Sequence, residues 1–118
     1  MVKGKEKHEP GACKQRLLPV QDALEVLSGK WKLPIIISLQ FGNKRFKQIA
    51  NEIPGLTDKS LSKELKELEA NQLVKRSVYD TFPPTVEYSI TEHAKSLNKV
   101  IEALYLWGAE HRKKIIGK

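Results

Sequence analysis

The residues best placed to do chemistry form a polar face on one predicted helix, between Thr57 and Leu68. At about 100° per residue, the leucines of this segment fall on one stripe: Leu61, Leu65 and Leu68. Its lysines fall on the opposite stripe: Lys59, Lys63 and Lys66. Thr57 and Asp58 can cap the first turn, because their side-chain oxygens accept its free N–H groups. The pattern suits a helix that reads the major groove of DNA, although a solvated surface helix would show the same face.

The overall charge of the chain favours an acidic partner. The 118 residues carry a formal net charge of +7, with a sequence pI near 9.5. Nucleic acid is the commonest partner of such a chain, and a membrane surface is the rival. The basic residues are spread over several segments, so we expect no membrane anchor. With no secretory signal and a single cysteine, Cys13, we expect a cytoplasmic, reducing location.

Hydrophobic spacing predicts helices on both sides of the polar face. We expect residues 1–16 to form a flexible basic tail and residues 17–118 to form one domain. The first helix is predicted from about Leu17, with Pro19 in its first turn, to the Ser28–Lys30 stop. A buried helix should follow from about Trp31 to Gln40, and a third from Phe46 to Ile53. Together with the Thr57 helix, the third helix makes a helix-turn-helix.

A β-hairpin is predicted after the Thr57 helix. The segments Leu73–Tyr79 and Thr85–Ile90 are rich in strand-forming residues, and the prolines of the loop between them cannot pair in a ladder. Lys44–Phe46 is a further short extended piece. A hairpin that directly follows a helix-turn-helix is a wing, here of two or three strands.

The last predicted helix is long and carries an uncovered apolar stripe. We expect Thr91 to cap it and expect it to run to about Ile116. Its stripe consists of Leu97, Val100, Ile101, Leu104 and Trp107. Such a stripe indicates a subunit interface unless it packs wholly inside the monomer.

Several segments resemble the HxlR-type winged-helix regulators. They include Ser28–Leu33, with Gly29-Lys30-Trp31-Lys32 at its centre, and the wing segment Pro83–Tyr88. The match extends from about Leu17 to Glu110. The resemblance implies a bacterial or archaeal homodimeric transcription factor whose first and last helices form the dimer. Leu17 and Leu24 would then join the last-helix stripe in the interface.

The chain departs from the family pattern at two positions. Family members often sense oxidants or electrophiles through a cysteine beside the proline of the first helix, where this chain has Leu18. Cys13 is the possible redox residue that remains: either a sensor, whose thiolate adjacent cations would favour, or an exposed thiol without a role. The glycine usual after the reading helix is replaced by Gln72, so we expect Asn71 to adopt the left-handed cap.

No other constellation indicates catalysis or a cofactor. The three histidines and Cys13 show no metal-ligand spacing, and we find no phosphate loop or nucleophile elbow. We therefore predict a protein that is not an enzyme and that binds no metal or cofactor.

These patterns predict a mainly α (α+β) winged helix-turn-helix with a long C-terminal dimerisation helix. We expect a homodimer that binds double-stranded DNA sequence-specifically and regulates transcription, with repression the favoured direction. The expected major-groove residues are Thr57, Lys59, Ser60, Ser62 and Lys63, with Lys66 nearer the backbone. The expected phosphate or minor-groove residues are Lys44, Arg45 and, at the wing tip, Thr81, Pro83, Pro84 and Thr85. The alternative is a winged-helix module that binds protein; a steep fall of duplex affinity with salt would favour DNA. The effector is left unassigned.

Overall fold

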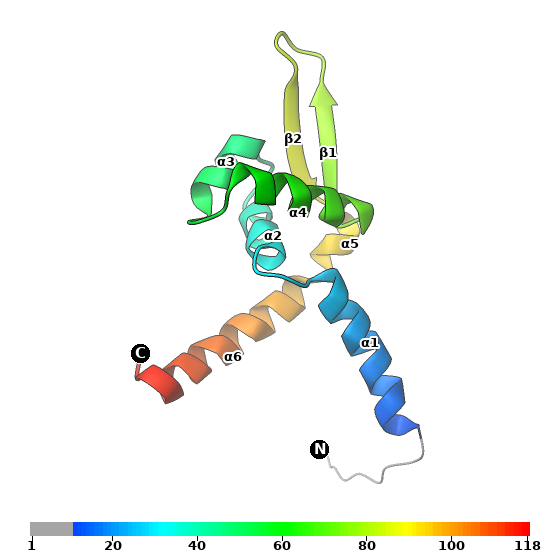
Figure 1. Cartoon of the computed structure of the whole chain (residues 1–118), viewed down its shortest axis with the longest axis vertical. Helices are drawn as coiled ribbons and strands as arrows, with labels where there is room; N and C mark the ends of the chain where they lie inside the picture. The colour runs from blue at the N-terminus through cyan, green and yellow to red at the C-terminus, as the bar shows by residue number, and fades with distance from the viewer. Residues whose placement is uncertain (1–10) are drawn as a thin grey trace.

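The structure confirms the predicted mainly helical winged helix-turn-helix. This computed structural model describes residues 11–118, and predictions that fall on residues 1–10 lie outside the described residues. The elements are, in order, α1 (Ala12–Val26), α2 (Lys32–Gln40), α3 (Phe46–Glu52), α4 (Asp58–Ala70), β1 (Val74–Tyr79), β2 (Thr85–Ile90), α5 (Glu92–Lys95) and α6 (Asn98–Ile116). Figure 1 shows α2, α3, α4 and α5 gathered at the base of the wing, while α1 and α6 project away from them on the opposite side.

The core is centred on α2, as its nearly continuous apolar sequence predicts. Ile35 and Ile36 of this helix are fully buried, and Leu39 is almost so. They pack with buried leucines of α4 and with Ile49 of α3. Pro34 lies in the first turn of α2, where the N–H that it lacks would have no helical acceptor. Both helices of the helix-turn-helix, α3 and α4, therefore pack against the apolar helix α2.

Helix α4 begins at the predicted cap. The Thr57 Oγ1 accepts the backbone N–H of Ser60 at 3.1 Å, which satisfies one of the free donors of the first turn. The Asp58 carboxylate follows in that turn and pairs with Lys47 of α3 at 2.7 Å. A carboxylate at this end also interacts favourably with the helix dipole. The turn between α3 and α4 is thus fixed by a cap and by one exposed ion pair.

The end of α4 corrects one prediction, because Gln72 and not Asn71 adopts the left-handed conformation. Gln72 has φ 62° and Asn71 has φ −90°. The Leu73 N–H donates to the Leu68 carbonyl at 2.9 Å and the Gln72 N–H to that of Glu69 at 3.0 Å, which is a Schellman motif. Leu68 and Leu73 are both buried. Both leucines are buried when Gln72 adopts the left-handed conformation. This burial outweighs the usual preference for asparagine in that conformation.

The wing is an antiparallel hairpin that carries a short third segment. β1 and β2 pair from Val74 opposite Ile90 to Tyr79 opposite Thr85. The backbone of Lys44 exchanges hydrogen bonds with Tyr88 of β2, at 3.0 and 2.7 Å, so the predicted extended piece lies against the hairpin. At the tip, the Thr81 hydroxyl donates to the Pro83 carbonyl at 2.8 Å. The wing therefore points away from the core as a supported ribbon (Figure 1).

The two projecting helices differ from the predictions in their boundaries. α1 begins at Ala12, so residues 12–16, which we assigned to the flexible tail, are helical, and Pro19 lies inside the helix instead of in its first turn. Residues 12–18 include several good helix formers, which outweigh the tail-like composition.

The predicted last helix is broken into α5 and α6, and Thr91 caps the short α5. Between them the N–H groups of Ser96 and Leu97 bond three residues back, to His93 and Ala94. This tighter turn redirects the chain, so Leu97 packs on the core while α6 leaves it.

We predict that Gln72→Gly stabilises the fold. Glycine adopts positive φ without the steric cost that a side chain brings, so the free energy of unfolding should rise by about 1 kcal/mol. Denaturant unfolding of the purified protein would measure the change. Asn71→Gly is the matched control, because its φ of −90° needs no glycine and the substitution should bring no gain. Equal effects of the two substitutions would contradict the assigned cap.

Candidate nucleic-acid interface

The outer face of α4 carries the predicted cations. Lys59, Lys63 and Lys66 are exposed, whereas the leucines of the opposite stripe are buried. A shallow groove on this face is lined by residues of α4 alone: Lys59, Ser62, Lys63, Lys66 and Glu67. Thr57 is exposed at the start of the helix, and Ser60 and Ser62 are half-buried beside the lysines. The structure thus places the predicted major-groove residues on one side of one helix.

A buried ion cluster attaches α4 to the core. The Lys32 ammonium of α2 lies 2.6 Å from the Glu64 carboxylate and 2.6 Å from that of Glu67, both on α4. The Lys32 and Glu64 side chains are only 6% and 10% exposed, whereas Glu67 is 43% exposed. Glu67 also lies 3.5 Å from Lys63. The cluster therefore connects the centre of the core to a lysine of the outer face, and sequence spacing did not reveal it.

The environment of the cluster favours the charged forms of Lys32 and Glu67. Burial alone would lower the pKa of Lys32, but the hydrogen bonds and charges of Glu64 and Glu67 raise the pKa above its ordinary 10.5. The hydrogen bond from Lys32, followed by its charge, lowers the pKa of Glu67 below its ordinary 4.5. Both shifts favour the ionised pair near neutral pH.

Lys44 does not belong with the exposed cations. Its ammonium donates to the Ser38 carbonyl at 2.7 Å and pairs with the Glu52 carboxylate at 2.6 Å. The side chain is 12% exposed. The hydrogen bonds from Lys44 and Ser38 lower the pKa of Glu52. The Lys44 side chain therefore ties α2 to α3, and this packing argues against the predicted phosphate contact. Its neighbour Arg45 is exposed.

The wing supplies a second set of exposed groups. Thr81, Pro83 and Pro84 are exposed at its tip, and Thr85 is half-buried at the start of β2. A further cation that the predictions missed, Arg76 of β1, lines a groove of about 510 Å³ together with Ser62 and Lys66 of α4. Arg76 lies beside Ser62 and Lys66 only because the hairpin packs against α4. The local sequence around Arg76 therefore did not indicate that it belongs to this surface.

The projecting helices expose the predicted interface residues to solvent. Leu17 and Leu24 of α1 are 46% and 65% exposed, and Leu104 and Trp107 of α6 are 50% and 66% exposed. Val100 is exposed as well. Leu97 and Ile101 differ, because they are half-buried and pack against the core. The structure therefore leaves most of the predicted stripe uncovered in the monomer.

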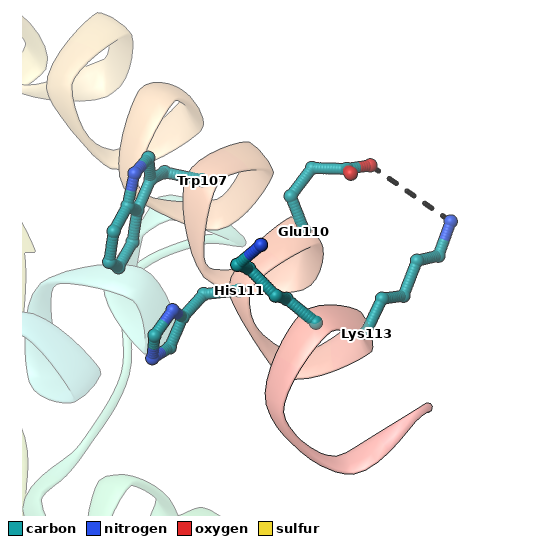
Figure 2. A pocket seen from close by; sticks show the side chains of 5 residues that line it. Trp107, Glu110, His111 and Lys113 are labelled. Carbon is teal, nitrogen blue, oxygen red and sulfur yellow. Dashed lines mark ion pairs between the residues drawn. The ribbon is translucent and has the colours of Figure 1, made fainter.

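The far end of α6 is both aromatic and basic. The Trp107 and His111 rings stack with centroids 4.8 Å apart, and Glu110 pairs with Lys113 at 4.0 Å (Figure 2). Lys114 lines the same surface recess. Stacking fixes the tryptophan on one side of the helix, where it stays accessible to a partner.

Comparison with known proteins assigns the chain to a family. A model of the HxlR-like helix-turn-helix family matches residues 26–115. The chain belongs to this family. It is 39% identical over 100 residues to the uncharacterized HTH-type transcriptional regulator YtcD of Bacillus subtilis, covering 85% of this chain and 79% of that protein. An uncharacterized HTH-type transcriptional regulator of Methanothermobacter thermautotrophicus is 40% identical over 92 residues, covering 78% of this chain and 70% of that protein.

A solved structure of another protein shows the same arrangement. The redox regulator HypR in its reduced form superposes with a TM-score of 0.79 and 36% identity. The match covers 85% of this chain and 99% of that chain. The arrangement of helices and wing is therefore shared well beyond the helix-turn-helix.

Cys13 is an exposed thiol in the first turn of α1. Leu18 occupies the place of the sensing cysteine that the family resemblance implies. Among residues 11–118 no three His, Cys, Asp or Glu side chains gather as a metal site. No helix of the described range is long and apolar enough to cross a membrane.

We predict that Lys32→Met destabilises the fold by roughly 3 kcal/mol, because Glu64 is left buried without its counter-charge. Lys32→Met/Glu64→Leu should recover most of this loss, since no buried charge then remains at that pair. Denaturant unfolding of both variants would test the cluster, and a double variant no more stable than the single one would contradict it.

The contribution of the cluster should also depend on pH. Because the folded-state pKa of Glu67 is depressed, its contribution is present above pH 4.5 and is lost as pH falls through the folded value. Because that of Lys32 is raised, its contribution is present below pH 10.5 and is lost as pH rises through the folded value. The stability difference between wild type and Lys32→Met should therefore shrink at both extremes.

We predict that Cys13→Ser leaves DNA affinity unchanged and that oxidant changes wild-type affinity by less than about tenfold, or 1.4 kcal/mol. Cys13 lies in the first turn of α1, and that end of α1 is the one that lies away from α4 (Figure 1). Modification shifts affinity only through a differential effect on the bound and free states. Titrations of a labelled duplex before and after oxidation would measure it. A larger loss that Cys13→Ser abolishes and reductant reverses would identify a thiol sensor.

Proposed function

We propose that this HxlR-like protein is a homodimeric transcriptional regulator that binds double-stranded DNA sequence-specifically. The observation that carries the proposal is the lysine face of α4, capped at Thr57 and held by the buried Lys32 cluster beside a wing. Relatives named HTH-type transcriptional regulators support it. The net charge of +7 would add a general attraction to the duplex.

Each part of the interface would have its own role in the complex. The start of α4 would enter the major groove, with Thr57, Lys59, Ser60, Ser62 and Lys63 near base edges. Lys66 and Arg76, which line one groove between α4 and the wing, would hold the phosphate backbone. Arg45 would contact phosphate, and the wing tip at 81–85 would reach the adjacent minor groove or backbone. Lys44 is not among the proposed DNA contacts, because its ammonium is paired with Glu52.

The proposed dimer would place two reading helices on one face of the DNA. Its interface would use the exposed apolar residues of α1 and α6, because such faces are rarely left in water. A two-fold dimer binds half-sites about one helical turn apart, roughly 34 Å, and its operator is a palindrome. We propose repression as the direction of regulation, since a bound dimer would occlude polymerase.

Selection of bound duplexes from a random pool would test this proposal most directly. We expect a palindromic sequence to emerge and its affinity to fall steeply as salt rises. A reporter gene controlled by that sequence would then give the direction of regulation. Failure to bind any duplex at low salt would reject the proposal in favour of a protein-binding module.

We predict that Lys63→Ala weakens operator binding by about 1–3 kcal/mol if the side chain reads a base, with the loss confined to one base position. Folding should be nearly unchanged, because the side chain is 69% exposed. Duplex titrations with every base at each position would measure the effect. Lys99→Ala, at an exposed position of α6, is the matched control. An equal loss on all sequences would assign Lys63 to phosphate, and no loss would remove α4 from the interface.

We predict that Leu104→Glu disrupts the dimer. A charge at the centre of the α6 stripe would be buried without a partner in the assembled protein, so monomer should predominate at micromolar concentration and tight operator binding should be lost. Light scattering would compare this variant with wild type and with Lys99→Glu, which adds the same residue elsewhere on α6. A wild-type monomer would contradict the proposed dimer.

A further inference from the structure

An aromatic side chain is fully exposed at the end of the wing. Phe82 lies in the loop between β1 and β2 and is 101% exposed. Figure 1 shows this loop at the end of the wing that is farthest from the helices. A phenylalanine carries a large apolar surface, and a single exposed one is ordinary elsewhere on a protein. At the end of a projecting ribbon, however, such a ring is among the first groups that a partner of the wing meets.

The loop offers no positive charge to a polyanion. The sequence from Val78 to Val86 holds no lysine or arginine, and its one charged residue is Asp80, which is exposed. A carboxylate repels phosphate oxygens, and an aromatic ring donates no hydrogen bond to them. A contact between this loop and DNA would therefore be apolar, made inside a groove and not on the phosphate backbone.

The conformation of the loop is fixed by its own hydrogen bonds. The Thr81 hydroxyl donates to the Pro83 carbonyl at 2.8 Å and lies 2.9 Å from the Thr85 hydroxyl. The Thr81 N–H donates to the Tyr79 carbonyl at 2.8 Å. Two successive prolines restrict the backbone directly after Phe82. A loop that is ordered beforehand loses little conformational entropy on binding, so its ring is well prepared for insertion into a partner.

The wing is long enough to carry this loop beyond the phosphates that its base would hold. In the proposed complex, Arg76 and Lys66 line the groove that holds the backbone. At about 3.3 Å per residue, the ribbon extends roughly 10 Å from Arg76 to Tyr79 before the loop begins. The minor groove of B-DNA is only about 6 Å wide and about 7.5 Å deep. The loop would therefore pass one backbone strand and reach into the adjacent minor groove.

We infer that Phe82 is a wedge that enters this minor groove and partly unstacks one base step beside each half-site. The inference rests on the proposed DNA binding and deepens it, because it names a specificity-determining residue and the DNA feature that it recognises. Apolar side chains inserted in this way bend the duplex toward the major groove, which brings more DNA surface against the protein. Pyrimidine–purine steps such as TA unstack most easily. Phe82 therefore gives a sequence preference at a position that no hydrogen bond reads.

Replacement of the ring tests this inference. Phe82→Ala removes the wedge and Phe82→Leu keeps an apolar one; both should fold, because the position is fully exposed. The probe is the duplex that wild type selects from a random pool, with fluorescent end labels that report bending and 2-aminopurine at successive flanking positions that reports unstacking.

The two variants should differ in every readout. Phe82→Ala should lower affinity by roughly tenfold, reduce the bend and abolish the 2-aminopurine signal at the flanking step. Phe82→Leu should keep most of all three, because leucine also serves as a wedge. A selection repeated with Phe82→Ala should lose the flanking pyrimidine–purine step while it keeps the half-site that α4 reads.

Two control variants separate the wedge from other roles. Phe41→Ala removes a ring that is 82% exposed at the end of α2, and it should bind and bend the duplex as wild type does. Lys66→Ala should reduce the slope of log affinity against log salt by about one for each bound subunit. Phe82→Ala should leave that slope unchanged, because it removes no phosphate contact.

The outcomes distinguish this inference from the proposed function. If wild type binds the selected duplex and Phe82→Ala bends it equally, the wedge is wrong and the proposed DNA binding stands. A loss of affinity without a change in the 2-aminopurine signal would place the ring outside the base stack and would also overturn insertion. A changed oligomeric state of free Phe82→Ala, measured by light scattering, would identify a protein contact instead. If wild type binds no duplex at low salt, the proposed function itself is rejected.

Discussion

The orientation of α4 depends on one buried ion cluster. The leucines of α4 pack against the core, but apolar contact is non-directional and tolerates a small rotation of the helix about its axis. The Lys32 ammonium, 2.6 Å from both Glu64 and Glu67, is directional, because a short charge-assisted hydrogen bond accepts little change in geometry. The cluster therefore specifies which residues of α4 face outward, while the leucines supply most of its attachment.

The lysines of this chain have quite different roles. The net charge is therefore larger than the positive charge that is exposed to a polyanion. Lys32 is buried in the core, and Lys44 is turned toward Ser38 and Glu52. Lys63 lies on the outer face and shares Glu67 with Lys32. These lysines lie within a short stretch of sequence, yet only the last is free to meet a nucleic acid. These three lysines differ in where the folded chain places the nearest carboxylate.

Much of the fold could be predicted from sequence because its signals are local. The leucine spacing and the Thr57 cap define α4 within a few turns, and strand composition defines the hairpin. The features that were missed depend on contacts between distant segments: Lys32 meets Glu64 across 32 residues of sequence. Gln72 takes the left-handed conformation because Leu68 and Leu73 must both be buried. The break between α5 and α6 likewise follows from packing, because it allows Leu97 to pack against the core.

The position of β1 in the sheet has a consequence for solubility. β2 lies between β1 and the Lys44 segment, so within the described residues the outer edge of β1 has no strand beside it. Unpaired edges invite pairing with other chains and aggregation, and charged side chains are a common safeguard. Lys75 and Arg76 stand on this strand, and both are exposed. Arg76, which would serve a nucleic-acid contact, therefore also helps to protect this edge from pairing with a second molecule, so a variant that neutralises it could lose DNA binding through aggregation as well as through the missing contact.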